Sequence, residues 1–497
     1  LLVAFAPAAT AAAAPILVLW LASPAIAWGI SRPLARREAR LTPGQSLHLG
    51  KLARRTWAFF DTYVGAEDHW LPPDNFQEHP VAVVAHRTSP TNIGLALLAN
   101  LTAHDFGYIP AGEALERTAS TLGTMASMQR HEGHFFNWYD TLTLEPLLPR
   151  YVSAVDSGNL AGHLVTLRAG LLGVADGPVL PVNWVAGLSD TLLTLAEALG
   201  SAAAAPLARM LDDLEAAAGA PAGTIESART WLERLDADAV KVAALVAERE
   251  HASAEPADDA TFWARALVRQ SHALREELEL LAPAARGAIP TLRAVAHEEA
   301  RAGEAGPAGL RLARIDELAR QCEALARMDY GFLYDRSRHL LAIGYNVAEA
   351  RADAGYYDLL ASEARFGSFV AIAQGELPQE NWFALGRLLT SAGGRPALLS
   401  WSGSMFEYLM PLLVMPAYEG TLLDRTCRAS VERQIAYGRQ RGVPWGISEC
   451  GYNSVDAGLN YQYRAFGVPG LGLKRGLADD LVIAPYASAL ALMVAPG

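Results

Sequence analysis

Apolar residues recur at helical spacing along most of this 497-residue chain. Residues three or four positions apart share one face of an α-helix, so a repeat of this period marks the side that packs. From Ser46 to about residue 175 the pattern predicts helices near residues 47–65, 92–104, 111–128 and 159–173. The loops between them are rich in aromatic and polar residues, and we expect these loops to gather at one end of a helical toroid.

The segment 186–327 has a different character. It is rich in Ala, Glu, Arg and Leu, contains few aromatic residues and repeats its apolar positions at a heptad-like spacing. Apolar stripes beside mixed charge are typical of long amphipathic helices that pack on one another. We interpret this segment as a helical insertion or spacer.

Two further elements are predicted in the C-terminal third. Residues 328–346 contain two aromatic and aliphatic runs separated by a polar tip, which predicts a β-hairpin. Residues 356–376 have helical spacing that places Leu359, Glu363 and Phe366 on one face. Glu363 is therefore predicted to lie on an apolar face, where an ionised carboxylate is costly.

The N-terminal stretch, residues 1–31, has no charged side chain, and four arginines come after it between Arg32 and Arg40. An uncharged run of this length can span ~30 Å of hydrocarbon, and the arginines place the rest of the chain in the cytoplasm. The sequence thus predicts a transmembrane segment, with a buried core helix as the alternative. The chain begins with Leu rather than Met, which suggests a fragment of a longer protein.

Composition narrows the classes of function. A formal charge of -12 argues against nucleic acid as a partner, because phosphates attract clustered Lys and Arg. The three cysteines lie far apart without CxxC spacing, so neither a disulfide framework nor a zinc finger is indicated. The HEGH run at 131–134 lacks the HExxH spacing of a zinc site, and no phosphate-binding GxxxxGK[ST] occurs. No metal or cofactor is predicted.

Three carboxylates lie where carboxylates are costly: Glu363, Glu407 in an otherwise uncharged run, and Glu449 among Trp, Gly and Tyr. A single buried Glu is commonly a structural hydrogen bonder, but three among aromatic rings favour a carbohydrate site. The candidate sugar-binding side chains are Trp382, Trp401, Trp445, Tyr408, Tyr452, Asn453, Asp335, His86, Arg87 and Trp138, with Asn92, Asn137 and Asp156 beside them in the early loops.

Four long motifs carry a family resemblance: MDYGFLYDRSRHLLAIGYNV, YYDLLASEARFGSFVAIAQGELPQENW, SWSGSMFEYLMPLLVMP and PWGISECGYN. Through them the chain, from roughly Arg32 to its C-terminus, resembles the glycoamylase-like region of bacterial cyclic β-1,2-glucan synthases. The resemblance implies an (α/α)6 barrel that cuts and rejoins linear β-1,2-glucan by transglycosylation, closing it into rings. The relatives are large inner-membrane proteins that also carry a glycosyltransferase module and a phosphorylase-like module, neither of which is visible here.

The resemblance also assigns roles. Glu363 in LLASEAR resembles the general acid/base, Glu449 in WGISE resembles the nucleophile, and Glu407 in SMFEYL is a third candidate. A retaining enzyme needs a protonated acid and, ~5 to 5.5 Å away, an ionised nucleophile. Burial of Glu363 fits the acid, because desolvation raises the pKa of a carboxyl group. Glu449 lies in a glycine-containing loop whose backbone can offer donors, so it can stay ionised.

The predicted fold is all-α: an (α/α)6 barrel with a small β-hairpin, a helical insertion and an N-terminal transmembrane segment. Its predicted divisions are 1–31 (transmembrane segment), 32–185 (first part of the barrel), 186–327 (insertion) and 328–497 (catalytic part). The expected location is the bacterial inner membrane, with the catalytic part in the cytoplasm. A plain endo-β-1,2-glucanase on the same barrel and a non-catalytic glycan-binding scaffold remain as alternatives.

Overall fold

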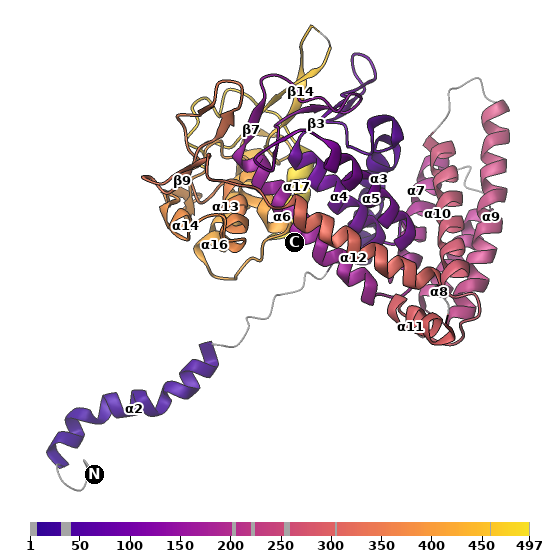
Figure 1. Ribbon diagram of the computed structural model, residues 1–497, viewed down its shortest axis with the longest axis horizontal. Coiled ribbons are helices and arrows are strands. Elements are labelled where there is room, and N and C mark those ends of the chain that lie inside the picture. Colours follow the sequence, from indigo (N-terminus) through magenta and orange to yellow (C-terminus); the bar gives the residue numbers. More distant parts are fainter. Residues whose placement is uncertain are drawn as a thin grey trace.

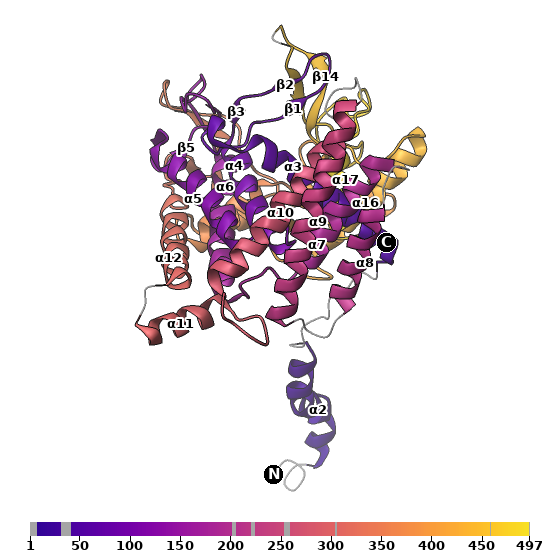
Figure 2. The same cartoon turned by 90° about the vertical axis from the view of Figure 1, so that its right-hand side faces the viewer.

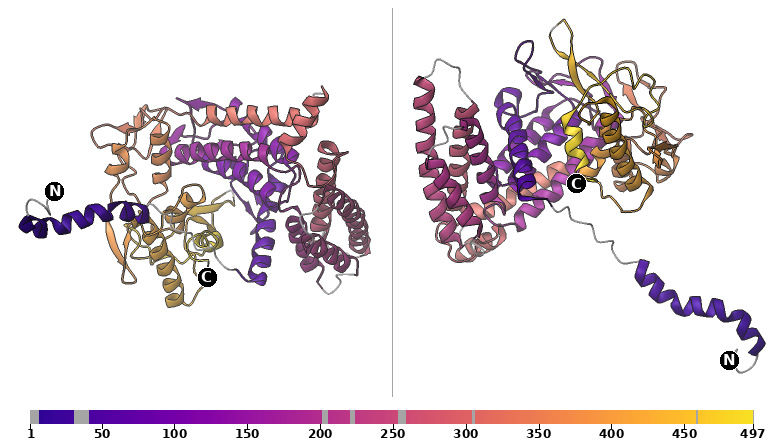
Figure 3. Two further views of the ribbon diagram at one scale, coloured as in Figure 1. Left: turned by 90° about the horizontal axis from the view of Figure 1, so that it is seen from below. Right: turned by 180° about the vertical axis from the view of Figure 1, so that it is seen from behind.

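A computed structural model describes residues 7–30, 41–200, 205–219, 224–252, 259–303, 306–457 and 459–496. Helices make up most of the fold, and the strands are short (Figure 1). Helices therefore dominate, but the described residues form seven small sheets where the all-α prediction included a single β-hairpin. The closing of the helices into an (α/α)6 barrel stays a prediction. Helix α2 (Pro7–Ile30) lies apart from the other elements, as Figure 1 and the right-hand view of Figure 3 show.

The predicted transmembrane segment over residues 1–31 is wrong. In the part of the chain that the structure describes, no helix combines the length and the apolar character needed to cross a membrane. Residues 1–6 and 31 lie outside the described ranges. Within α2, Pro15 and Pro24 each remove a backbone donor from the helix, and small residues such as alanine supply much of the sequence. A lack of charge is therefore not a sufficient signal for a span.

The helices of the first half form the framework of the site: α3 (Pro43–Tyr63), α4 (Pro90–Asp105), α5 (Ala111–Ser127) and α6 (Ala154–Asp176). They overlap all four helices that the apolar spacing predicts. Thr42, Ser89 and Ser153 precede α3, α4 and α6, and each accepts a hydrogen bond from a backbone N–H of the first turn. Helix α6 packs against α4, α12 (Pro307–Leu325) and α13 (Ala364–Ala373).

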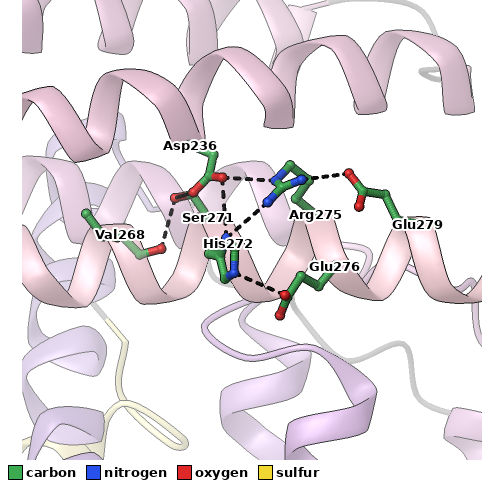
Figure 4. Close-up of polar contacts among 7 residues, drawn as sticks. All are labelled: Asp236, Val268, Ser271, His272, Arg275, Glu276 and Glu279. Atoms are coloured by element: carbon green, nitrogen blue, oxygen red, sulfur yellow. Dashed lines mark hydrogen bonds and ion pairs between the residues drawn. The ribbon is translucent and has the colours of Figure 1, made fainter.

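The middle of the chain forms α7 (Trp184–Leu199), α8 (Ala205–Gly219), α9 (Ile225–Ala252), α10 (Asp259–Leu281) and α11 (Leu292–Ala302). Figure 4 shows polar contacts between α9 and α10, where Asp236 accepts hydrogen bonds from Ser271 Oγ at 3.2 Å and Arg275 Nε at 2.9 Å. Partly exposed ion pairs contribute only about 0–1 kcal/mol each to stability. The packing of α9 on α10 therefore depends mainly on the buried apolar face of α10. The division at 186–327 stays a prediction.

The strands pair antiparallel in small sheets. β7 (Tyr151–Ser153), β10 (Gly344–Asn346) and β11 (Arg351–Ala352) form one sheet in the order β11-β10-β7. The two-stranded sheets are β1 (Phe76–Gln77) with β2 (Val83–Val84), β3 (Arg87–Thr88) with β6 (Tyr139–Asp140), β4 (Arg130–His131) with β5 (His134–Phe135), β8 (Tyr334–Asp335) with β9 (Leu340–Leu341), β12 (Leu389–Ala392) with β13 (Arg395–Leu398), and β14 (Cys450–Val455) with β15 (Tyr461–Arg464). The β8–β9 pair confirms the predicted hairpin.

The C-terminal third adds α14 (Glu380–Ala384), α15 (Met405–Leu409), α16 (Leu422–Arg441) and α17 (Pro485–Ala491). Its buried residues form a second hydrophobic cluster, beside the larger cluster of the preceding helices. Leu360 belongs to the C-terminal cluster and Phe366 to the larger one. Glu363 therefore lies where the two clusters meet.

The helix predicted over residues 356–376 is shorter than its apolar spacing suggests, because α13 begins at Ala364. Tyr356 and Leu359 instead form isolated bridges with Ala342 and Gly386. The first residues of this stretch are therefore extended and bridged to other segments, not helical. Glu363 occupies the N-cap position, where its side chain makes no capping hydrogen bond and is free to face the site.

Candidate active site

Glu363 and Glu449 line the same two cavities. One has a volume of about 530 Å³ and is also lined by Trp401, Ser402 and Glu407; we call it the Trp401 lobe. The other has a volume of about 700 Å³ and is lined by residues of α4, α6 and β14–β15 together with Trp138; we call it the Trp138 lobe. Both lobes share Ile343, Tyr357, Glu363 and Glu449. The two lobes therefore form one cleft with the two carboxylates between them.

Close packing of α6 on α13 places Glu363. A Cβ added to Gly158 of α6 would lie 2.4 Å from the Cα of Gly367 in α13, so a larger residue would force the helices apart. This approach brings Asn159 Nδ2 to 3.0 Å from Glu363 Oε2, to which it donates a hydrogen bond. Asn159 also donates to Thr91 Oγ1 at 3.2 Å. Glu363 is thus held from the α6 side by a side chain that is itself fixed by α4.

The surroundings of Glu363 favour its protonated form. Burial raises the pKa of Glu363 well above its usual value, and the charge of Glu449 raises it further. The hydrogen bond from Asn159 opposes this shift, since it stabilises the carboxylate. A carboxyl group whose protonated form is favoured is suited to general acid catalysis, the role that the sequence suggested for this residue.

Glu449 immediately precedes β14 and receives two hydroxyl donors. Ser404 Oγ donates to Glu449 Oε1 at 2.9 Å, and the Tyr463 hydroxyl donates to Oε2 at 2.7 Å. Burial raises the pKa of Glu449, while these two hydrogen bonds lower it. Among the described residues the donors to this carboxylate are hydroxyls, in place of the backbone N–H groups that the sequence suggested.

Glu407 has a structural setting. It is the third residue of α15, and its carboxylate accepts hydrogen bonds from the backbone N–H of Ser404 at 3.2 Å and of Ser402 at 3.1 Å. The Ser402 hydroxyl donates to it at 2.5 Å. Ser404 in turn accepts the N–H of Glu407, which completes a capping box. This geometry fixes the Ser404 hydroxyl that contacts Glu449.

Three of the predicted sugar-binding residues line the cleft. Trp401 lines its lobe with 42% of its surface exposed. Arg87 and Trp138 line the other lobe, where the guanidinium carbon of Arg87 lies 5.2 Å from the centre of the Trp138 ring. Asp74 holds Arg87 by an ion pair of 3.0 Å. Asn92, Asn137 and Asp156 line the Trp138 lobe as well.

The other predicted sugar-binding residues lie outside the linings of both lobes: Trp382, Trp445, Tyr408, Tyr452, Asn453, Asp335 and His86. Tyr408 is buried, and its hydroxyl lies 2.8 Å from the carbonyl oxygen of Leu471. Asp335 accepts a hydrogen bond from the Tyr356 hydroxyl at 2.7 Å, and His86 contacts Asp68 at 2.8 Å. Their assignment to sugar binding stays a prediction.

Sequence reasoning missed Asn159, Ser404 and Tyr463. Ser404 and Glu407 match the S-x-x-E pattern of a capping box, which could have shown that Glu407 caps a helix. Asn159 lies three positions after Asp156, a spacing that puts both on one face of α6, but the predicted helix began at residue 159 and left Asp156 in the loop. Tyr463 reaches Glu449 because β14 and β15 pair as an antiparallel hairpin, and no local sequence pattern predicts that contact.

Comparisons with known proteins agree with the motifs. Residues 355–497 match the Glycoamylase family model, described as "Putative glucoamylase". The chain is 42% identical to the cyclic β-(1,2)-glucan synthase NdvB of Rhizobium meliloti (strain 1021). This chain is similar to a segment of a cyclic β-1,2-glucan synthase. The alignment covers 97% of this chain but only 17% of NdvB, and the resemblance predicted from the four motifs is confirmed.

Solved structures also share similarity with the chain. With an endo-β-1,2-glucanase from Talaromyces funiculosus bound to sophorose, the TM-score is 0.49 at 10% identity, over 91% of this chain and 75% of that one. With an endo-β-1,2-glucanase from Chitinophaga pinensis, in complex with sophorotriose and glucose, the TM-score is 0.43 at 13% identity, over 92% of this chain and 82% of that one.

Proposed function

We propose that this chain is a glycosidase-type transglycosylase that closes linear β-1,2-glucan into rings with retention of the anomeric configuration. The chain is 42% identical to NdvB over 97% of the chain's own length, which supports β-1,2-glucan as the substrate. One observation carries the proposal: Glu363 and Glu449 lie at the junction of two lobes of a single cleft. A glucan chain lying through both lobes presents a glycosidic bond to both carboxylates.

In the first step Glu449 attacks the anomeric carbon while Glu363 gives its proton to the leaving glycosidic oxygen. The bond between that carbon and that oxygen breaks, and a glycosyl ester forms on Glu449. The hydroxyl donors Ser404 and Tyr463 favour the ionised nucleophile at the start of this step.

In the second step Glu363 accepts the proton of a hydroxyl at the far end of the same glucan chain, whose oxygen displaces Glu449. Esterification removes the negative charge of Glu449, which is one of the causes that raise the pKa of Glu363. The pKa of Glu363 therefore falls once the ester forms, so the same group changes from acid to base.

Ring closure requires that this hydroxyl outcompete water. Trp401 in one lobe and Trp138 with Arg87 in the other offer faces on which sugar rings can stack. An acceptor held on these faces reacts as part of the same complex, which favours transfer over hydrolysis.

The whole protein's further parts are proposals of the same kind. The chain spans 17% of the length of NdvB, and a glycosyltransferase module and a phosphorylase-like module in the remaining length stay predictions. The bacterial inner membrane as the location, with the catalytic part in the cytoplasm, stays a prediction as well.

A product assay tests the proposal. The protein is incubated with linear β-1,2-glucan and the products are analysed by mass, where a ring is lighter by one water than the linear chain with the same number of glucose units. We expect rings, and NMR of the first-formed products should show the retained anomer. Short linear sugars would indicate an endo-β-1,2-glucanase, and unchanged substrate would indicate a glycan-binding scaffold.

A further inference from the structure

Gln77 links two segments that are far apart in the sequence. It is the last residue of β1, and only 2% of it is exposed. Its side-chain oxygen accepts a hydrogen bond from the backbone N–H of Tyr461 at 2.8 Å, and its nitrogen donates to the carbonyl oxygen of Leu459. Figure 2 shows β1 and β14 together at one end of the molecule. The amide of Gln77 thus binds the turn of the β14–β15 hairpin as the backbone of a neighbouring strand would.

Both linked segments form the wall of the Trp138 lobe. Phe76, next to Gln77, lines this lobe, as do Tyr461 and Tyr463 of β15. The Tyr463 hydroxyl is the one that donates to Glu449 Oε2 at 2.7 Å. The tip of the hairpin and the contact to Glu449 therefore belong to one short strand, two residues apart.

The base of the hairpin has other supports. Arg464 at the end of β15 pairs with Asp480 at 2.7 Å, and Tyr452 of β14 packs edge to face on Phe466 with ring centres 5.3 Å apart. These contacts hold the hairpin to the C-terminal cluster when its tip is released. Loss of the Gln77 bridge should therefore move the tip and β15 without unfolding the hairpin.

We propose that Gln77 is a positioning residue for the reaction, which holds the β14–β15 hairpin so that the Tyr463 hydroxyl stays on Glu449. This inference rests on the proposed function, in which Glu449 is the nucleophile. Gln77 itself does not line the cleft, so it acts through Tyr463.

A double-mutant cycle tests the inference. Gln77→Met removes both contacts to the hairpin at similar side-chain length, and Tyr463→Phe removes the hydroxyl. We expect each to lower kcat about tenfold, as for loss of a hydrogen bond to a charged group. The double variant should be no slower than Tyr463→Phe alone, since both changes remove the same contact.

Two readouts separate positioning from mere stability. The acidic limb of kcat/KM against pH should move to higher pH in Gln77→Met and in Tyr463→Phe alike, because the Tyr463 hydrogen bond lowers the pKa of Glu449. The matched control is Gln462→Met, because among the described residues the side-chain amide of Gln462 donates only to the Asn460 carbonyl of the same hairpin, at 3.5 Å. This control variant should keep the wild-type kcat and the wild-type position of the acidic limb.

A crystal structure of Gln77→Met gives a readout that does not need turnover. We expect the Tyr463 hydroxyl to lie beyond hydrogen-bond reach of Glu449. An unchanged contact, additive losses in the cycle, or a lower thermal midpoint without a shift of the limb would each overturn the inference. Failure of the wild-type protein to act on β-1,2-glucan would overturn the proposed function instead, and the crystal structure would still decide the place of Gln77.

Discussion

Asn159 and Glu363 are joined by a hydrogen bond of 3.0 Å from the amide nitrogen to the carboxylate oxygen. Asn159 is buried, and its amide oxygen has no partner within the described part of the chain. An unpaired buried polar atom costs about 1–3 kcal/mol, which is tolerated most readily where the other end of the side chain serves the site. Here that end limits how far the pKa of Glu363 rises.

Replacing Asn159 by Ala is expected to move the alkaline limb of kcat/KM to higher pH. The amide stabilises the ionised carboxylate, so its removal raises the pKa of Glu363 further and the acid keeps its proton longer. The measurement is kcat/KM against pH on β-1,2-glucan. Asn183→Ala is the control, because within the described ranges the amide of Asn183 donates only to the carbonyl of Asp105. A shift of the limb to lower pH would contradict the role of Asn159.

Glu363→Gln should stabilise the fold at neutral pH. The pKa of Glu363 is raised in the folded state above its unfolded value of about 4.3. The stability that the protonated group contributes is therefore complete below the unfolded pKa and is lost as pH rises through the folded pKa. Glutamine has no such loss, so the variant should be more stable than the wild type at pH ~8.

Urea unfolding at pH ~4 and ~8 measures this difference. The gap between variant and wild type should be small at the lower pH, where the wild-type group is largely protonated in both states. A wild type more stable than the variant at the higher pH would show that ionised Glu363 is not costly.

The roles of Glu363 and Glu449 can be told apart by changing the leaving group of the substrate. Glu363→Gln and Glu449→Gln should each lower turnover of β-1,2-glucan by about 10³-fold or more, because Gln keeps the shape but can neither give the acid's proton nor attack as a carboxylate. With an activated donor, whose leaving group needs no proton, Glu363→Gln should recover activity and Glu449→Gln should not. Recovery in the Glu449 variant would reverse the two roles.

The sequence predicted those parts of the fold and site that depend on local spacing. The helices of the first half and the β8–β9 hairpin could be predicted from apolar spacing and a polar tip, and both carboxylates were found because they interrupt apolar runs. The start of α13 was misplaced because residues 356–359 pair in extended form with distant segments. Periodicity cannot show that competition, since the bridging residues lie elsewhere in the chain.

Contacts between distant segments also decide which aromatic residues face the cleft. Trp401 and Trp445 both occur in Gly- and Ser-containing stretches near a candidate carboxylate, yet only Trp401 lines a lobe. Trp445 packs on α16, where its Cβ would lie 2.8 Å from a Cβ added to Gly438. The Tyr463 contact likewise depends on the hairpin that Gln77 holds. Sequence spacing identifies such candidate residues, but it cannot show which of their side chains face the cavity.

Glu407→Ala should act mainly on stability, because alanine cannot close the capping box at the start of α15, whereas a glutamine there could. Its carboxylate accepts from Ser402 and Ser404 at the start of α15, and loss of a capping box costs about 0.5–2 kcal/mol. The thermal midpoint should fall, and turnover should fall far less than in Glu363→Gln, because Ser404 is displaced rather than removed. Turnover as low as in Glu363→Gln, with an unchanged midpoint, would make Glu407 a member of the catalytic pair.

Trp401→Ala should shift the products from rings toward short linear sugars. Trp401 lines its lobe with 42% of its surface exposed, so the ring face can receive a sugar of the acceptor chain. Loss of the stacking face should remove about 1 kcal/mol of acceptor binding, which lowers the ratio of transfer to hydrolysis roughly fivefold. Water reaches the glycosyl ester in either case, so total consumption of the glucan should change less than the ratio.

Trp445→Ala is the matched control. It removes a tryptophan of the same part of the chain, but this tryptophan packs on α16, so the change should lower the thermal midpoint and leave the ratio of transfer to hydrolysis unchanged. Equal shifts in the two variants would mean that tryptophan packing, and not stacking in the Trp401 lobe, controls the fate of the ester.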